Sequence, residues 1–559
     1  MKYVETSRND VLFDRDAAYD YTMTGMLKRE TIGEDSVQGR DYTYTLLGQI
    51  KGINHPALDP AKDPGRDGVA STTANPNPNA NVAKDAFGMA FHYHANDFVH
   101  TTNGTPSVFA DGQPGMLGVA QPNGAPAYDL YSGQIGAWSM KTQEIPAATL
   151  NGATLLRNGT LVGERFRYDV LGRLREDTTY SHDGTSWLSD GAGGWSASFR
   201  YDQNSNIRKV KRWAMTGATQ SQMIDDAITH HATVGSDVPD EIDDAGAPIA
   251  GNESHEVRST DVSSSSWTDA RGLFTSLPFA NYTTSMAYDR SHRVENLAQE
   301  HQSLVLLRDA FGVVVRHDQY TTSAGGNVLE RSLYYRHTSQ LRLDVTYERE
   351  SVDNTPSLTA WEISGARRHG TVERTATAPP TGVDQREIGN RYYVVADHLG
   401  STRGVVSDVA LKQGGTKMPD VVAALDYDQY GGLRWRRGYV GEVQLKHRWQ
   451  GMRLFDGAPS ESMYLTPHRV YDARVLRWTA HDPIYRAGIT PYSALDGMPN
   501  LFIDPMGTEI TTQAPPASSS TPTQAQVDLR NMAGPWAAAV TFTNFTTALG
   551  VERSRMGLD

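Results

Sequence analysis

Cysteine is absent from the 559 residues of this chain. Its absence excludes disulfide bonds, a thiol nucleophile and any metal site built from thiolates. Long hydrophobic runs are missing too. The nearest approach, residues 536–551, is interrupted by four threonines and Asn544, so we expect no membrane-spanning helix. The first ten residues, MKYVETSRND, lack the apolar stretch of a signal peptide.

Positively charged residues are fewer than negatively charged ones. The chain has 52 Lys and Arg against 65 Asp and Glu, a net charge of −13, which argues against a nucleic-acid partner. No Walker loop, Rossmann fingerprint or nucleophile elbow is present, so we expect no cofactor. His92 and His94 have the spacing of residues on one strand face. No third ligand stands at a recognisable distance from them, so we expect no metal site there.

Turn formers and tyrosine are abundant, and they predict the fold class. The sequence has 51 Gly, 27 Pro and 26 Tyr. Tyrosine suits half-buried pleated surfaces, and glycine and proline suit tight turns. No long stretch shows helical periodicity. We therefore predict an all-β fold made of many short strands.

A recurring element, Tyr-Asp-x-x-Gly-x-aliphatic, organises most of the chain. In it we expect a strand to end at Tyr, Asp to start the turn, and Gly to supply a positive φ before the strand returns. A His in the Gly position, as at His292, should require a different turn. Complete copies have Tyr168, Asp169 and Gly172, or Tyr427, Asp428 and Gly431. Variant copies begin at Tyr21, Tyr44, Tyr201 and Tyr288, and shorter ones without Tyr span 85–88 and 309–312.

The segment 469–507 contains two Asp-Pro pairs, Asp482-Pro483 and Asp504-Pro505. The residues between them are dense in turn formers, so the chain can fold back and place the two carboxyls side by side. Neighbouring carboxyls cannot both ionise cheaply, and such a pair can act as acid and base together. The alternative is that each Asp only opens a turn before Pro.

These elements resemble a known family. The repeat is similar to the YD repeat of RHS proteins, and the segment 469–507 resembles the RHS-repeat-associated core domain. The matching core residues are Arg469, Tyr471, Asp472, Arg477, Trp478, Asp482, Pro483, Tyr492, Pro499, Asp504, Pro505 and Gly507. Leu476 and Met498 stand where that family has Gly and Asn. The resemblance implies a β-hairpin sheet that spirals into a partial hollow cocoon closed by the core as a plug, as in bacterial polymorphic toxins and the C subunits of toxin complexes.

The resemblance also implies a chemistry. In that family the core is similar to an aspartyl protease that cuts its own chain just after the second DPxG motif and frees a variable C-terminal segment. Carried onto this chain, Asp482, Asp504 and Arg469 are the catalytic candidates, and the cut is expected at or next to Thr508–Glu509. Two departures weigh against cleavage: the first pair reads HDPIY, and Thr508 stands where the family has Leu. Arg469 could instead pair with Asp472.

We expect three regions: a repeat shell over 1–444, the core over 445–507, and a variable tail over 508–559. Residues 70–82 and 236–266 are expected as loop insertions, and 511–526 as a linker. The chain begins like the middle of a repeat, so we expect an N-terminally incomplete piece of an exported or cell-surface bacterial protein.

Two functions remain open. One is a self-cleaving shell whose partners are its own C-terminal cargo, missing N-terminal repeats or a partner shell subunit. The other is a non-cleaving surface protein that binds glycan or protein.

Overall fold

Two antiparallel sheets make up most of the computed structural model, which describes residues 2–7, 13–98, 101–102, 105–106, 109, 113, 115–118, 129–144, 159–189, 195–202, 205–216, 219–227, 229–230, 239–242, 248–250, 257–258, 273, 276–279, 282–299, 301–323, 326–338, 343–350, 355–364, 368–373, 391–438, 446–458, 462–484, 486, 489–508 and 510–512. No α-helix occurs in these residues, and no described helix is long and apolar enough to cross a membrane. The predicted all-β class is confirmed.

The first sheet has thirteen strands that follow almost the order of the sequence. Its strands are β1 (Tyr3–Ser7), β2 (Phe13–Tyr21), β3 (Leu27–Ile32), β4 (Gln38–Tyr44), β5 (Ile50–Ile53), β6 (Phe87–His92), β9 (Ala137–Thr142), β10 (Val162–Tyr168), β11 (Leu174–His182), β12 (Trp187–Ser189), β13 (Ala197–Tyr201), β14 (Ile207–Thr216) and β15 (Thr219–Ala227).

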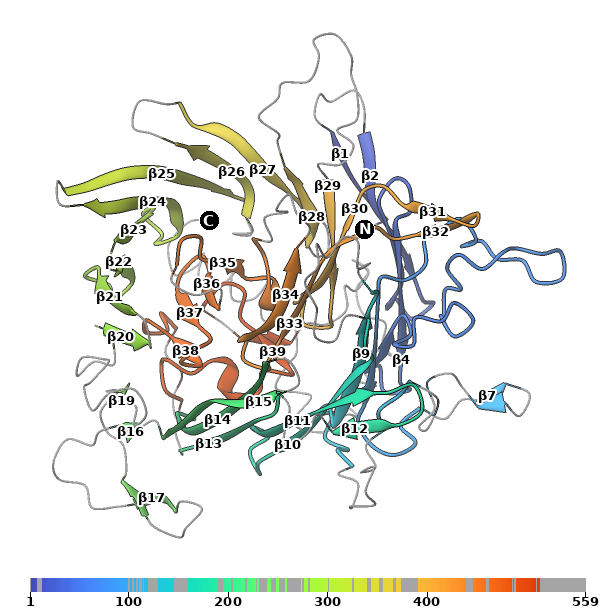
Figure 1. Ribbon diagram of the computed structural model, residues 1–559, viewed down its shortest axis with the longest axis horizontal. Helices are drawn as coiled ribbons and strands as arrows, with labels where there is room; N and C mark the ends of the chain where they lie inside the picture. The colour runs from blue at the N-terminus through green and yellow to red at the C-terminus, as the bar shows by residue number, and fades with distance from the viewer. Residues whose placement is uncertain are drawn as a thin grey trace, which may run out of the picture.

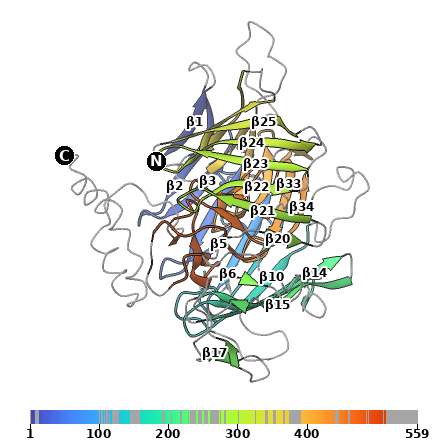
Figure 2. The same cartoon turned by 90° about the vertical axis from the view of Figure 1, so that its left-hand side faces the viewer.

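The second sheet also has thirteen strands, and Figure 2 shows β20 to β25 stacked one above another. Its strands are β20 (Ser276–Phe279), β21 (Tyr282–Tyr288), β22 (Val294–Gln299), β23 (Gln302–Arg308), β24 (Val314–Ser323), β25 (Gly326–His337), β26 (Leu343–Arg349), β27 (Ser357–Ser364), β28 (Arg368–Glu373), β29 (Arg391–Ala396), β30 (Thr402–Ser407), β33 (Val421–Tyr427) and β34 (Leu433–Gly438).

A compact segment, 446–507, lies between the two sheets (Figure 1). It contains the 3-10 turns η2 (Trp449–Gly451) and η3 (Leu495–Gly497) and the strands β35 (Arg453–Leu454), β36 (Met463–Leu465), β37 (Val470–Asp472), β38 (Arg477–Trp478) and β39 (Phe502–Ile503), the last paired with β40 (Thr511–Thr512). Short two-stranded ladders lie elsewhere: β7 (Thr101–Thr102) with β8 (Thr105–Pro106), β16 (Thr229–His230) with β19 (Val257–Arg258), β17 (Pro239–Ile242) with β18 (Pro248–Ala250), and β31 (Leu411–Gln413) with β32 (Thr416–Met418).

The hairpins that carry the repeat share one register, because the same turn chemistry closes each of them. In the copy at 168–174, the Asp169 carboxylate accepts the N–H groups of Leu171 and Arg173, both at 2.9 Å, and Gly172 has φ +84°. Tyr168 pairs with Leu174 after a bulge. The same Tyr-to-aliphatic pairing occurs at Tyr21–Leu27, Tyr44–Ile50, Tyr201–Ile207, Tyr288–Val294 and Tyr427–Leu433.

Two expectations about the repeat are wrong. His292 adopts φ +61° and the copy at 289–293 keeps the standard turn, with Asp289 accepting the N–H of Arg293 at 2.9 Å. The carboxylate hydrogen bonds hold the turn despite the cost of positive φ. Residues 85–88 do not form a turn at all, since β6 begins at Phe87. Asp85 instead lies beside other buried carboxyls.

The segment 446–507 is bonded to both sheets, which explains its central place. Arg212 of β14 donates to the Ala473 carbonyl at 2.8 Å, and the Tyr288 hydroxyl of β21 donates to the Thr479 carbonyl at 3.0 Å. Within the segment, the ring of Tyr471 packs on Trp449 and Trp478 at centroid distances of 5.1 and 5.3 Å. One hydrophobic core runs through both sheets and this segment. In the part of the chain that the structure describes, the two sheets partly enclose the segment and stay separate, as predicted for a partial cocoon (Figure 1).

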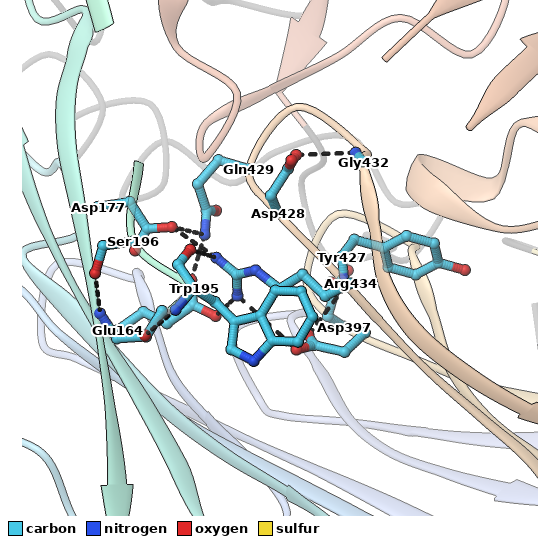
Figure 3. Close-up of polar contacts among 12 residues, drawn as sticks. Glu164, Asp177, Trp195, Ser196, Asp397, Tyr427, Asp428, Gln429, Gly432 and Arg434 are labelled. Atoms are coloured by element: carbon cyan, nitrogen blue, oxygen red, sulfur yellow. Dashed lines mark hydrogen bonds and ion pairs between the residues drawn. The ribbon is translucent and has the colours of Figure 1, made fainter. Parts of the chain in front are cut away.

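A polar seam also joins the two sheets directly. Arg434 of β34 donates to Glu164 of β10 at 2.5 Å and to Asp177 of β11 at 2.8 Å. Figure 3 shows Arg434 reaching across to both carboxylates, with Gln429 beside them. Further along, Arg391 of β29 donates to Asp14 of β2 at 2.8 Å. Burial of these ionic groups makes the seam a specific and costly contact.

The predicted loop insertions have different outcomes. Residues 70–82 are free of strands and lie in a loop between β5 and β6. Asn77 orders this loop, because its amide donates to the carbonyls of Arg66 and Val69 at 2.7 Å each. Most of 236–266, and the whole tail beyond Thr512, lie outside the described residues. The expected region boundaries therefore stay predictions.

Candidate functional site

Arg469 lies at the centre of the candidate site. It directly precedes β37, where Thr466 fixes the backbone: the Thr466 hydroxyl donates to the Arg469 carbonyl at 2.8 Å and accepts its N–H at 3.1 Å. The guanidinium packs over the ring of Trp478 with its carbon 4.3 Å from the ring centre. Only 2% of the side chain is exposed. A rigid turn and an aromatic platform therefore aim a buried cation.

The Arg469 guanidinium contacts both aspartates and two backbone carbonyls, those of Pro491 and Gly507. Its Nη2 lies 3.1 Å from Asp482 Oδ2 and 3.0 Å from Asp504 Oδ2. Its Nε donates to the Gly507 carbonyl at 2.5 Å, and its Nη1 to the Pro491 carbonyl at 3.3 Å. Both carboxyls therefore share one nitrogen and are neighbours in space.

Asp482 serves as a turn former and as a ligand of Arg469. Its Oδ1 accepts the Ile484 N–H at 2.9 Å, and its own N–H donates to the Pro491 carbonyl at 2.9 Å. Its side chain is only 4% exposed. The turn that Asp opens before Pro483 is what points Oδ2 at Arg469. Here the turn-forming role and the pairing of carboxyls occur together.

Asp504 follows β39 and is bonded to the backbone that comes after it. Its Oδ1 accepts the Thr508 N–H at 2.9 Å, and its side chain is 1% exposed. Burial raises the pKa of Asp504, while the charge of Arg469 opposes that rise. Arg469 is shared by both carboxyls, and Arg486 Nη2 also lies 3.8 Å from Asp482 Oδ2. The second cation favours the ionised form of Asp482, so Asp504 is the carboxyl better placed to keep a proton.

Gly507 makes the close approach of the tail possible. Its φ is +73°, and a Cβ at this position would lie 2.3 Å from Thr466 Oγ1. A side chain here would push the peptide away from Arg469. The motif therefore needs glycine for backbone shape and for space.

The structure brings Arg469, Asp482, Asp504 and Thr508 together. Glu509, the residue on the other side of the predicted Thr508–Glu509 cut, lies outside the described residues. The alternative that Arg469 pairs with Asp472 is wrong, because Asp472 binds Arg474 at 2.6 Å.

Sequence reasoning missed the Pro491 carbonyl and Thr466. A main-chain carbonyl carries no residue-type signal, and one Thr near a turn carries little.

The two histidines considered as metal ligands do not share a strand face. His92 lies in β6, fully buried, with Nδ1 3.4 Å from the Lys51 ammonium. His94 lies beyond the end of β6 and stacks on Tyr131 with ring centres 4.4 Å apart. Because β6 ends at His92, His94 is not part of the strand, and the two rings do not share a strand face.

Comparisons with known proteins bear on the fold. No protein-family model matches the sequence, and neither does any curated protein. Among solved structures the chain is similar to one described as the crystal structure of TcdB2-TccC3-Cdc42, with TM-score 0.56 and 12% identity over 96% of this chain and 20% of that one. It is also similar to TcdB2-TccC3, with TM-score 0.55 and 12% identity over 90% of this chain and 20% of that one.

A third similar structure is TcdB2-TccC3 without hypervariable C-terminal region, with TM-score 0.51 and 12% identity over 90% of this chain and 20% of that one. This chain thus spans about a fifth of the length of the chains it matches. At this identity the likeness concerns the fold alone: an all-β architecture shared with part of those much longer chains.

Proposed function

We propose that this chain is part of an RHS-type shell that holds a C-terminal segment, and that Asp482, Asp504 and Arg469 release this segment by one intramolecular cut. The observation that carries the proposal is the convergence of one buried guanidinium on two carboxyls and on the Gly507 carbonyl. The resemblance to the RHS core and the shared fold with TcdB2-TccC3 support it. So does the description of one matched structure as lacking a hypervariable C-terminal region.

The roles of the two carboxyls follow from their surroundings. Asp504 keeps the shared proton, because burial raises its pKa. Asp482 is the base, since Arg486 lies 3.8 Å from it and adds to Arg469 and the Ile484 N–H in binding its ionised form. Water gives a proton to Asp482, and its oxygen bonds to the Gly507 carbonyl carbon. Negative charge develops on the carbonyl oxygen, where the Arg469 Nε–H already donates.

Breakdown of the tetrahedral intermediate completes the cut. In the intact chain the Thr508 N–H donates to Asp504 Oδ1 at 2.9 Å, which keeps the two groups together. Once the carbonyl carbon is tetrahedral, the Thr508 nitrogen has a basic lone pair, and the C–N bond breaks as this nitrogen takes the proton from the Asp504 carboxyl. The products are a carboxylic acid on Gly507, which passes its proton to the freed amine, and the amine on Thr508. Asp482 then holds a proton and Asp504 is ionised. The substrate is tethered to the site, which can be worth an effective molarity of about 10⁵ M. A barrier of roughly 21 kcal/mol still gives a rate of about 10⁻³ s⁻¹, enough for an event needed once.

The geometry favours the Gly507–Thr508 bond. Both sides of this peptide group are engaged, the carbonyl by Arg469 and the N–H by Asp504. The bond predicted from sequence, Thr508–Glu509, is the next one along the chain. N-terminal sequencing of the released fragment distinguishes them, because it begins with Thr508 in the first case and Glu509 in the second.

The shell part of the proposal requires further chain. In the described residues the two sheets stay separate, and the chain spans about a fifth of the chains it matches. Additional repeats or a partner shell subunit would complete the enclosure. A non-cleaving surface protein that binds glycan or protein is the alternative, and the absence of cleavage would favour it.

Intact mass of the purified full chain tests the cleavage directly. The wild type is expected to separate into two fragments on incubation, whereas Asp482→Asn and Asp504→Asn stay full length. Asn keeps the shape and the acceptor oxygen but cannot exchange a proton at neutral pH. Asp472→Asn is the matched control, because Asp472 lies in the same segment and binds Arg474 instead of Arg469. Wild type that remains intact beside both variants would falsify the cleavage.

A further inference from the structure

Four buried carboxyls meet at one place in the first sheet, far from Arg469 in the sequence. Asp41 lies on β4, Asp63 and Asp67 lie in the loop between β5 and β6, and Asp85 lies just before β6. One oxygen from each of Asp41, Asp63 and Asp67 falls within 4.8 Å of the others. All four residues are buried. Strand register and one loop therefore bring these carboxyls together.

The charge at this place is not balanced. Arg29 of β3 is bonded to Asp41 through Nη1 and to Asp67 through Nη2, the latter at 2.7 Å. Asp85 interacts electrostatically with Asp41, Asp63 and Asp67. Arg29, with Lys28 acting at longer range on Asp41, thus faces four carboxyls. Buried carboxylates in such excess require further cations or protons.

Two oxygens of the group are left without a hydrogen-bond donor when the carboxyls are ionised. Among the described residues, nothing donates to Asp67 Oδ2, and only a protonated Asp85 could donate to Asp63; both Asp67 Oδ2 and Asp63 Oδ1 are buried. Asp63 is 4% exposed and Asp67 is 1% exposed. Their second oxygens are satisfied: Asp63 Oδ2 accepts the Asp67 N–H at 3.0 Å, and Asp67 Oδ1 accepts from Arg29. A buried anionic oxygen without a donor calls for a proton, a water or a cation, and here two such oxygens belong to one cluster of carboxyls.

We propose that Asp41, Asp63 and Asp67, whose carboxylate oxygens lie within 4.8 Å of one another, form a binding site for Ca²⁺. Every donor in the set is a carboxylate oxygen, which suits hard cations and does not suit Zn²⁺ or Cu²⁺. The enclosed setting favours Ca²⁺ over Mg²⁺, because Mg²⁺ retains several of its waters. The ion would complete the charge balance that Arg29 begins.

The position of the site suggests what the ion does. The loop between β5 and β6 also contacts the β31–β32 hairpin beyond β30 of the second sheet, where the Lys84 N–H donates to the Lys417 carbonyl at 3.1 Å. Lys417 in turn binds Asp35 of the β3–β4 turn at 2.6 Å. Calcium would fix this loop to β4 and so strengthen one junction between the sheets. It would act on the stability of the shell and not on the cut.

Protons are the competing way to satisfy the cluster. Asp63 and Asp85 are close enough to share a hydrogen bond when one carries a proton. A cluster satisfied by protons alone has no need of a divalent cation. The two explanations differ in what CaCl2 does to the folded protein.

Two measurements at neutral pH distinguish the calcium site from a cluster satisfied by protons. They are titration calorimetry and thermal unfolding of the full chain with CaCl2, after EDTA has removed any metal. Wild type is expected to bind one Ca²⁺ with a dissociation constant below about 1 mM and to melt at a higher temperature with CaCl2. Asp63→Asn should weaken binding by about tenfold or more. Asp59→Asn, an exposed residue of the same loop, should bind as wild type does.

Two results would overturn the proposal. One is wild type that shows neither heat of binding nor a change in melting temperature in millimolar CaCl2. The other is Asp63→Asn that folds and binds Ca²⁺ as tightly as Asp59→Asn. If Asp63→Asn does not fold, the wild-type titration alone decides, because it needs no variant.

Discussion

At the scale of single residues, Arg469 makes a set of contacts that only a guanidinium can make. Its nitrogens reach Asp482, Asp504 and the Gly507 carbonyl at once, while its flat face packs on Trp478. Lysine carries the same charge on a single nitrogen at the end of a flexible stem. It can neutralise one carboxylate but cannot also hold the peptide in place.

We therefore expect Arg469→Lys to slow cleavage by about 10²-fold, a loss typical of a small misplacement of reacting groups. The fragment yield is followed by mass spectrometry, with circular dichroism to check that the β fold persists. Arg474→Lys is the control, since Arg474 lies in the same segment and binds Asp472. Cleavage by Arg469→Lys at the wild-type rate would mean that only the charge is needed.

At the scale of elements, the repeat turn tolerates more sequences than its consensus indicates. Thr22 and Thr45 replace Asp, and their hydroxyls accept the N–H groups of Met26 and Gln49 at 3.1 and 3.2 Å. Ser205 and His292 occupy the glycine position of the repeat with φ +63° and +61°. Leu476 adopts φ +60° where the RHS core pattern has Gly. The fixed hydrogen bonds and the flanking strands decide the turn. The consensus predicted the hairpins of the Tyr-containing copies correctly and wrongly assigned a turn to 85–88. Residue preference alone misjudged the turn at His292.

The strain in a variant turn can be measured at His292. Glycine there relieves the positive φ, worth about 1–2 kcal/mol, and gives back about 0.4–1 kcal/mol through a more flexible unfolded chain. We expect His292→Gly to be more stable than His292→Ala by about 0.5–1 kcal/mol in urea unfolding. Alanine is the reference because it also removes the ring contact with His481. Equal stability of the two variants would show that the turn stores no strain.

At the scale of the whole molecule, features that depend on local sequence patterns could be predicted, whereas contacts between the two sheets could not. The repeats predicted a sheet of hairpins, and the Asp-Pro spacing together with the family resemblance predicted that Asp482, Asp504 and Arg469 belong to one site. The contact of Arg434 with Glu164 and Asp177 was not foreseen. These residues lie on different sheets, about half the chain apart, and no periodicity links them. Pairings of this kind depend on how the two sheets meet in space.

This seam has more carboxyls than cations. Arg434 is shared by Glu164 and Asp177, and Arg403 is shared by Asp397 at 2.9 Å and Asp426 at 2.7 Å. Burial raises the pKa of Glu164, and it raises the pKa of Asp177 well above the ordinary range, although Arg434 opposes both shifts. The charged groups that face the pair are Arg434, Arg403, Asp426 and Asp428.

The sign of the pH dependence follows from these directions. Unfolded Asp and Glu lose their protons near a pKa of about 4, whereas the folded pair keeps a proton to higher pH. Between the two pKa values the folded state binds more protons, so its stability falls as pH rises.

We expect the melting temperature of wild type to decrease from about pH 5 to pH 8, the range above the unfolded pKa. Asp177→Asn should show a smaller decrease, because it leaves Arg434 paired with Glu164 alone. Asp183→Asn, in an exposed turn, should follow wild type. Other buried carboxyls contribute equally to all three proteins, so a wild-type slope in Asp177→Asn would show that this pair holds no proton.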